Sequence, residues 1–202
     1  MNTRLILLPL ALFASLLLGS PSRAEAPPEH VMARYPAQWV AQPIMRQDKL
    51  TVQQILPPGQ TSKDYTDAVI LERYEEDHQA PKEHVMSRAE ASRRSCDGVL
   101  SSTVDESPVN GYKAASIQFT CTKSHRNGKS GVMFVVAIAG RDALHVVSRV
   151  WLGPAVPANQ LVPIPNTTLA EWAAFVRTIT LCDSRDAQHP CPASPAQIPQ
   201  GK

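Results

Sequence analysis

The 202-residue sequence lacks the motifs that mark the commonest catalytic and nucleotide-binding sites. It contains no G-x-S-x-G nucleophile elbow, no H-E-x-x-H zinc motif, no phosphate-binding loop and no dinucleotide fingerprint. Each of these motifs supplies a nucleophile, a metal ligand pair or a row of backbone amides that the chemistry requires. We therefore predict no catalytic residue and no cofactor, and we treat enzymatic activity as the less favoured alternative.

Long hydrophobic runs are also scarce, because the chain has only one, at its start. Residues 5–18 are almost wholly apolar, follow the basic Arg4 and precede a polar stretch that ends at Ala24. Ser22 and Ala24 supply the small side chains that signal peptidase requires. The run of about 14 residues is shorter than the roughly 20 of a spanning helix. The sequence predicts a cleaved signal peptide (1–24), a periplasmic or secreted protein and no membrane span after cleavage.

The predicted mature chain has no net charge. Removal of residues 1–24 takes away Arg4 and Arg23 and no acidic residue, which leaves 18 basic and 18 acidic side chains. A nucleic-acid-binding domain usually carries a basic surplus, and so does a protein that binds anionic membranes. Charge therefore argues against both, and we expect the partner to be another envelope protein.

Four cysteines remain, and none forms a C-x-x-C pair of the kind found in structural zinc sites. An even number of cysteines in an exported chain indicates disulfides, and three pairings are possible. We favour Cys96–Cys121 together with Cys182–Cys191, the second of which closes a short loop near the end of the chain. We predict no metal site.

The densest apolar stretch reads as a β-hairpin of residues 132–139 and 144–151. A turn centred on Arg141 and Asp142 places Ala139 opposite Leu144 and Val132 opposite Trp151. Both faces of this hairpin are largely apolar, which predicts a central place in a sheet with a helix on at least one side.

Further strands are predicted at 49–56, 67–74 and 112–122, with a weak one at 99–104. A surface helix is expected at 81–96, and a C-terminal helix at 168–182 begins with a capping box and packs on the hairpin. This order predicts an α+β fold with a mainly antiparallel sheet. The expected domains are the signal peptide, a flexible lead-in (25–37), one disulfide-stapled domain (38–192) and a disordered tail (193–202).

Three residues of the hairpin make a candidate ligand site. In the predicted register His145, Arg149 and Trp151 share one face of the sheet, and polar groups on an apolar face need solvent or hydrogen-bond partners. One interpretation is a small pocket for an anionic or polar ligand. The other is a pair whose hydrogen bonds are satisfied within the protein.

The loop before the hairpin carries the second candidate, a cluster of four basic or titratable side chains. Lys123, His125, Arg126 and Lys129 lie within seven residues of one another around an Asn-Gly turn. They would suit contact with an acidic partner, and the alternative is an ordinary solvated turn.

Three segments resemble a known group of proteins. They are Asn110-Gly111-Tyr112 before the strand that ends in Cys121, the stretch 140–149, and Trp172 and Phe175 followed by the last two cysteines. This layout resembles a group of uncharacterised exported proteobacterial proteins, and the order of elements resembles the PsbP/Mog1 type of α+β domain. The resemblance implies a bacterial envelope protein that binds rather than catalyses.

These inferences together predict a non-enzymatic interaction protein of the bacterial envelope, of the secretion-accessory or toxin-immunity type. The alternative is a periplasmic small-ligand binder or enzyme that uses a pocket near His145 and Arg149. Such a pocket requires these side chains to be accessible.

Overall fold

The structure is a computed structural model, and it describes residues 28–191. The predicted signal peptide and the predicted tail lie outside the described residues. At the centre is the predicted hairpin, formed by β7 (Ser130–Ala139) and β8 (Ala143–Gly153). Ala139 pairs with Leu144 and Val132 pairs with Trp151, so the predicted register is confirmed.

The hairpin lies inside a seven-stranded antiparallel sheet of order β2-β4-β5-β8-β7-β6, with β3 paired to β4. β8 therefore has a paired strand on each side. Its two faces are apolar because both are covered, one by the core cluster that contains Val85 and the other by the cluster that contains Phe175. The other strands of this sheet are β2 (Val40–Ala41), β3 (Met45–Gln47), β4 (Leu50–Leu56), β5 (Asp67–Glu75) and β6 (Ala114–Cys121). The predicted strand at 99–104 forms one isolated bridge to β6, between Ser101 and Phe119.

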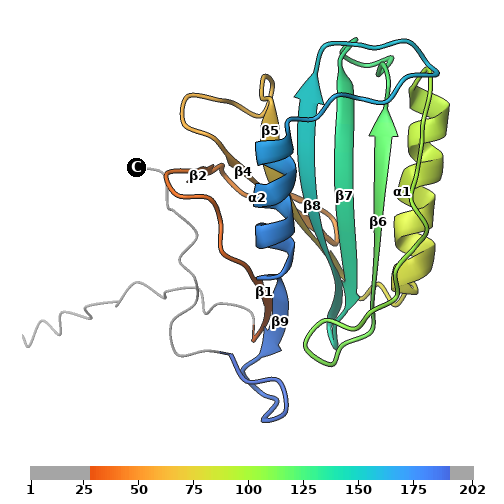
Figure 1. The fold of residues 1–202 in the computed structure, drawn as a ribbon. Helices are drawn as coiled ribbons and strands as arrows, with labels where there is room; N and C mark the ends of the chain where they lie inside the picture. The colour runs from red at the N-terminus through yellow and green to blue at the C-terminus, as the bar shows by residue number, and fades with distance from the viewer. Residues whose placement is uncertain (1–27, 192–202) are drawn as a thin grey trace, which may run out of the picture.

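One face of the sheet carries the first predicted helix, α1 (Pro81–Ser95), which contacts β6 and β7 (Figure 1). Val85 and Ala89 are buried against the sheet. Arg88 of this helix is half-buried. It donates two hydrogen bonds to the carboxylate of Glu72 on β5, at 3.1 and 2.9 Å, because that acid is buried and needs a partner.

The opposite face carries α2 (Asn166–Val176). Trp172 and Phe175 are buried, and the core clusters that contain them include Val132, Val136 and Val147 of the hairpin, so the predicted packing is confirmed. The predicted boundaries of this helix are wrong. Its N-cap is Pro165 without a side-chain cap, and the helix ends at Val176 rather than at residue 182.

The segment expected to finish that helix is instead a strand, β9 (Thr180–Asp183), paired with β1 (Glu29–Met32). Leu181 of β9 is fully buried, and strand pairing satisfies backbone groups that the helix would have satisfied. The flexible lead-in (25–37) is therefore a wrong assignment for residues 29–32, and the packed domain begins before residue 38.

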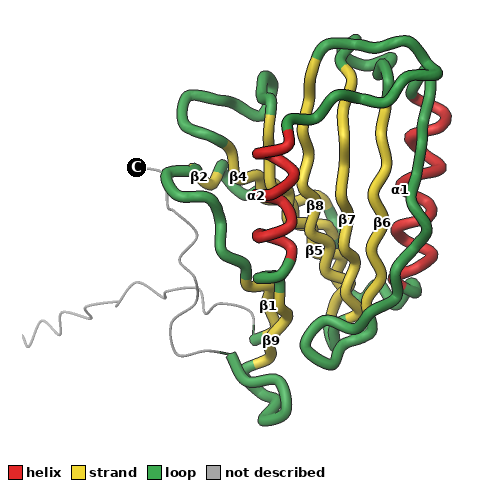
Figure 2. Tube along the Cα trace, viewed as in Figure 1, coloured by secondary structure: helices red, strands yellow, loops and turns green. Residues whose placement is uncertain are grey.

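Both predicted disulfides are confirmed. Cys96–Cys121 joins the end of α1 to β6, and Cys182–Cys191 closes the loop after β9. The Pro-rich connection 154–165 passes over the ends of the central strands and returns to α2 (Figure 2). The predicted α+β class is confirmed. Between residues 28 and 191, neither helix has the length and apolar character needed to cross a membrane.

Candidate functional site

His145 is held by an acid that comes from the start of the domain. Its Nε2 lies 3.1 Å from Oε2 of Glu29, a fully buried side chain of β1. The same carboxylate accepts hydrogen bonds from the backbone N–H groups of Arg141 and Asp142 in the hairpin turn. Burial acts to raise the pKa of Glu29, but the hydrogen bonds from His145 and the two amides lower it below its ordinary value. Glu29 therefore anchors β1 to the hairpin as a carboxylate.

Arg149 has a separate partner in an aromatic enclosure. Its guanidinium carbon lies 4.5 Å from the centre of the Trp39 ring, 5.5 Å from Phe175 and 5.6 Å from Trp172. Its Nη2 donates a hydrogen bond of 3.0 Å to Oδ2 of Asp67 on β5. Burial raises the pKa of Asp67 to about 6, although Arg149 acts against that rise.

The residues of the predicted ligand site do lie on one face of the sheet, as the register required. His145 and Arg149 nevertheless pair with different acids, Glu29 and Asp67. His145 is 3% exposed and Arg149 is 1% exposed, so neither side chain is accessible to a ligand in this conformation. Trp151 is half-buried and packs in the cluster of Val132 and Trp172. His145 and Arg149 each have an acidic partner within the protein, although Nε and Nη1 of Arg149 have no hydrogen-bond partner among the described residues. A ligand-binding role for the three residues stays a prediction.

An accessible hollow lies on the other face of the sheet, lined by residues of β3, β4, β8 and the loops at 57–66 and 122–129. It has a volume of about 720 Å³, and we call it the groove. Its apolar lining is Met45, Tyr65 and Leu152, and Met45 is 54% exposed. Its polar lining is Gln54, Ser62, Lys63, Asp64, Arg126, Asn127 and Lys129.

Two residues of the predicted contact loop, Arg126 and Lys129, line this groove. Lys129 donates a hydrogen bond of 3.1 Å to Asp64 on the facing loop. The other two do not line it: Lys123 is exposed elsewhere on the loop, and His125 pairs with Asp97 at 3.0 Å. The structure therefore divides the predicted cluster into a groove half and an outer half.

A smaller hollow of about 180 Å³ continues from the groove toward the Cys96–Cys121 disulfide. The two hollows share Asn127, Lys129 and Leu152 in their linings. Burial raises the pKa of Tyr65, which lines the groove, and the positive charges of Arg126 and Lys129 act in the opposite direction. Tyr65 therefore stays protonated at neutral pH and can donate a hydrogen bond to an acceptor in the groove.

Sequence reasoning missed the groove residues outside the loop. Met45 and Lys63 reach the groove through the pairing of β3 with β4 and through the 57–66 connection, which no local pattern specifies. It also missed Glu29 and Asp67, for which one signal existed. A buried polar or charged side chain requires a hydrogen-bond partner, so His145 and Arg149 each implied a partner elsewhere in the chain.

Compared with models of known protein families and with curated protein sequences, the chain matches none. Among solved structures it is similar to LpqN of Mycobacterium tuberculosis, described as involved in cell envelope biogenesis, with 15% identity and a TM-score of 0.44. That similarity covers 81% of this chain and 87% of LpqN. A second similarity is to PA94 of Pseudomonas aeruginosa, a protein of unknown function, with 15% identity and a TM-score of 0.35. It covers 61% of this chain and 98% of PA94. Similarities this distant carry no argument about function, and the resemblance to the PsbP/Mog1 domain stays a prediction.

Proposed function

We propose that this chain is a non-enzymatic, exported interaction protein that binds another protein of the bacterial envelope through the groove. The observation that supports this most is the convergence of a predicted contact loop with an accessible hollow: Arg126 and Lys129 line a groove of about 720 Å³. The two disulfides fit an exported protein, because such crosslinks persist in oxidising compartments. A role as a secretion accessory or as a toxin-immunity partner would fit this proposal equally.

The lining indicates the chemistry of the partner. Lys63, Arg126 and Lys129 outnumber the single acid Asp64, so the groove has a positive surplus that complements acidic side chains. Met45 and Leu152 supply apolar contact area on the same surface. The partner segment should therefore combine at least one acidic residue with apolar side chains.

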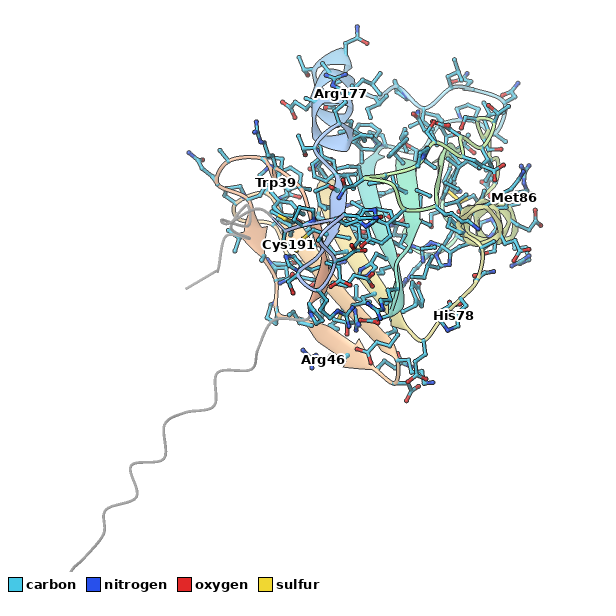
Figure 3. All side chains as sticks on the ribbon, turned by 90° about the horizontal axis from the view of Figure 1, so that it is seen from below. Trp39, Arg46, His78, Met86, Arg177 and Cys191 are labelled. Carbon is cyan, nitrogen blue, oxygen red and sulfur yellow. A yellow bond between two sulfur atoms is a disulfide. The ribbon has the colours of Figure 1, made fainter. Side chains whose placement is uncertain are left out.

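The test is affinity capture of the mature protein, disulfides intact, from the envelope fraction of its own organism. Wild type is compared with Arg126→Glu/Lys129→Glu, which reverses two charges in the groove. The matched control is Arg94→Glu/Arg177→Glu, two exposed arginines that do not line the groove. Met86 of α1 and Arg177 after α2 mark well-separated parts of the surface (Figure 3).

The proposal expects one stoichiometric protein that wild type and the control variant capture and the groove variant loses. Capture should weaken as salt is added, because screening reduces attraction between exposed charges. A partner captured equally by all three proteins would place the interface elsewhere, and the absence of any stoichiometric partner would contradict an interaction function.

A further inference from the structure

The pairing of β1 with β9 gathers soft metal-binding side chains at one place. His30 pairs directly with Cys182 across the two strands, and Met32 lies two residues farther along β1, on the same face as His30. His30 Nε2 lies 3.5 Å from Cys182 Sγ, and Met32 Sδ lies 3.6 Å from the same sulfur. The disulfide adds Cys191 as a fourth member of this cluster.

These distances suit a single metal ion. The donor atoms of His30, Cys182 and Cys191 all lie within 4.8 Å of one another, so one ion could contact all three after small adjustments. Thiolate and thioether sulfurs are soft ligands and select Cu(I), whereas carboxylates suit harder ions. The cluster offers two cysteine sulfurs, one thioether and one imidazole nitrogen.

We propose that reduction of the Cys182–Cys191 disulfide creates a binding site for one Cu(I) ion, with His30, Met32, Cys182 and Cys191 as ligands. The oxidised form described above has no thiolate to offer and does not bind the ion. The site is therefore controlled by redox state, and it is independent of the groove.

Reduction requires a dithiol of the thioredoxin class as the electron donor. Its thiolate attacks Cys191 Sγ, which is the more accessible sulfur because Cys182 is 1% exposed. Cys182 leaves as a thiolate, and the second thiol of the donor then breaks the mixed disulfide and releases Cys191. Two electrons pass from the donor, which becomes a disulfide. Cu(I) then binds the two thiolates, and any proton they have taken up goes to solvent.

The donors should stay together after reduction because the strands do not depend on the disulfide. Four residue pairs align β1 with β9, and Glu29 ties β1 to the hairpin through two hydrogen bonds from the turn and one with His145 of β8. Met32 is 8% exposed, so one side of the site excludes most water. A preformed arrangement of this kind favours metal binding over two isolated thiols.

The experiment measures Cu(I) binding under anaerobic conditions by competition with a chromogenic Cu(I) chelator. The full mature protein is tested oxidised, and again after reduction with a phosphine and removal of the reductant. Reduction also opens Cys96–Cys121, so Cys182→Ser reports any binding by that other pair. Met32→Leu and His30→Gln test the two non-cysteine ligands.

The matched controls are Met86→Leu and His125→Gln, which make the same changes at exposed positions outside the cluster. The proposal expects one Cu(I) per reduced chain and none per oxidised chain. Met32→Leu and His30→Gln should each weaken binding by at least about tenfold, and the two controls should not. Equal affinity in all four variants would mean adventitious binding by thiols alone. That result, or the absence of binding by the reduced wild type, would overturn the proposal.

Discussion

The ion pair between Arg149 and Asp67 gives a prediction that separates charge from packing. The Arg149 side chain is 1% exposed and that of Asp67 is 14% exposed. If either partner is removed, the remaining charge is therefore buried and has little water to solvate it. Breaking a buried pair in this way costs about 3–5 kcal/mol of folding free energy. Asp67→Asn should therefore destabilise the protein by an amount near the lower end of that range, since the amide oxygen can still accept one hydrogen bond.

Replacement of both partners should have a much smaller effect. Nε and Nη1 of Arg149 have no hydrogen-bond partner among the described residues, and each such buried group costs about 1–3 kcal/mol. Methionine fills a similar space without these groups and keeps contact with Trp39, Trp172 and Phe175. Arg149→Met/Asp67→Asn should thus be within about 1 kcal/mol of wild type, or more stable.

The loss of stability caused by the single variant Arg149→Met should depend on pH. The folded-state pKa of Asp67 is raised to about 6 from an ordinary value of 3.8, so folding favours the protonated acid. That contribution is fully present below pH 3.8 and is lost as pH rises through 6. Loss of Arg149 removes the charge that lowers this pKa. Arg149→Met should therefore lose more stability relative to wild type at pH 7 than at pH 5.

Urea unfolding followed by tryptophan fluorescence is a suitable assay, because Trp39 and Trp172 lie against Arg149. Lys82→Met is the control, since its pair with Glu106 is half exposed and such pairs contribute about 0–1 kcal/mol. If the double variant lost as much stability as Asp67→Asn, the reasoning from an uncompensated charge would be refuted.

Three further predictions concern the hairpin turn and the first disulfide. Glu29→Gln should cost about 1–3 kcal/mol at pH 7, measured by urea unfolding, because the turn amides and His145 lose a charged acceptor. The folded-state pKa of Glu29 is lowered, so its contribution is present above pH 4.5 and fades as pH falls; a difference from wild type that grew on acidification would contradict this. Gly140→Ala should also destabilise the protein, because a Cβ at position 140 would overlap the Glu29 carboxylate. Since the two residues are in contact, the stability losses of Gly140→Ala and Glu29→Gln should not add fully in the double variant. Replacing Cys96 and Cys121 by alanine should lower stability by about 2–4 kcal/mol, and an unchanged urea midpoint would show that this crosslink is not stabilising.

The parts of the fold that local patterns specify were predictable. The hairpin register followed from two apolar runs around a short turn, and α1 followed from Pro81 at the first position of the helix. The end of α2 was not predictable, because Thr180–Asp183 continues an apolar pattern that suits a helix until a second strand is available. That second strand, Glu29–Met32, has no alternation of its own. Its pairing with β9 joins segments from opposite ends of the chain.

The candidate sites also divide into features that local sequence specifies and features that depend on pairing of distant segments. The cluster of basic side chains before the hairpin was predictable because its members are neighbours in the sequence, and its contact role stays a prediction. The groove was not predictable, since it needs Met45 and Lys63 brought to Arg126 by strand pairing and by a loop. The soft-ligand cluster depends on the β1–β9 register, which places His30 opposite Cys182.

Site-specific photo-crosslinking in the native envelope tests the central claim most directly. A photoreactive residue replaces Lys63 in the groove, and in a second protein it replaces Arg177, which does not line the groove. We predict one discrete adduct with a single envelope protein from position 63 and none from position 177. An adduct from position 177 alone, or none from position 63, would contradict the proposal that this groove binds the partner.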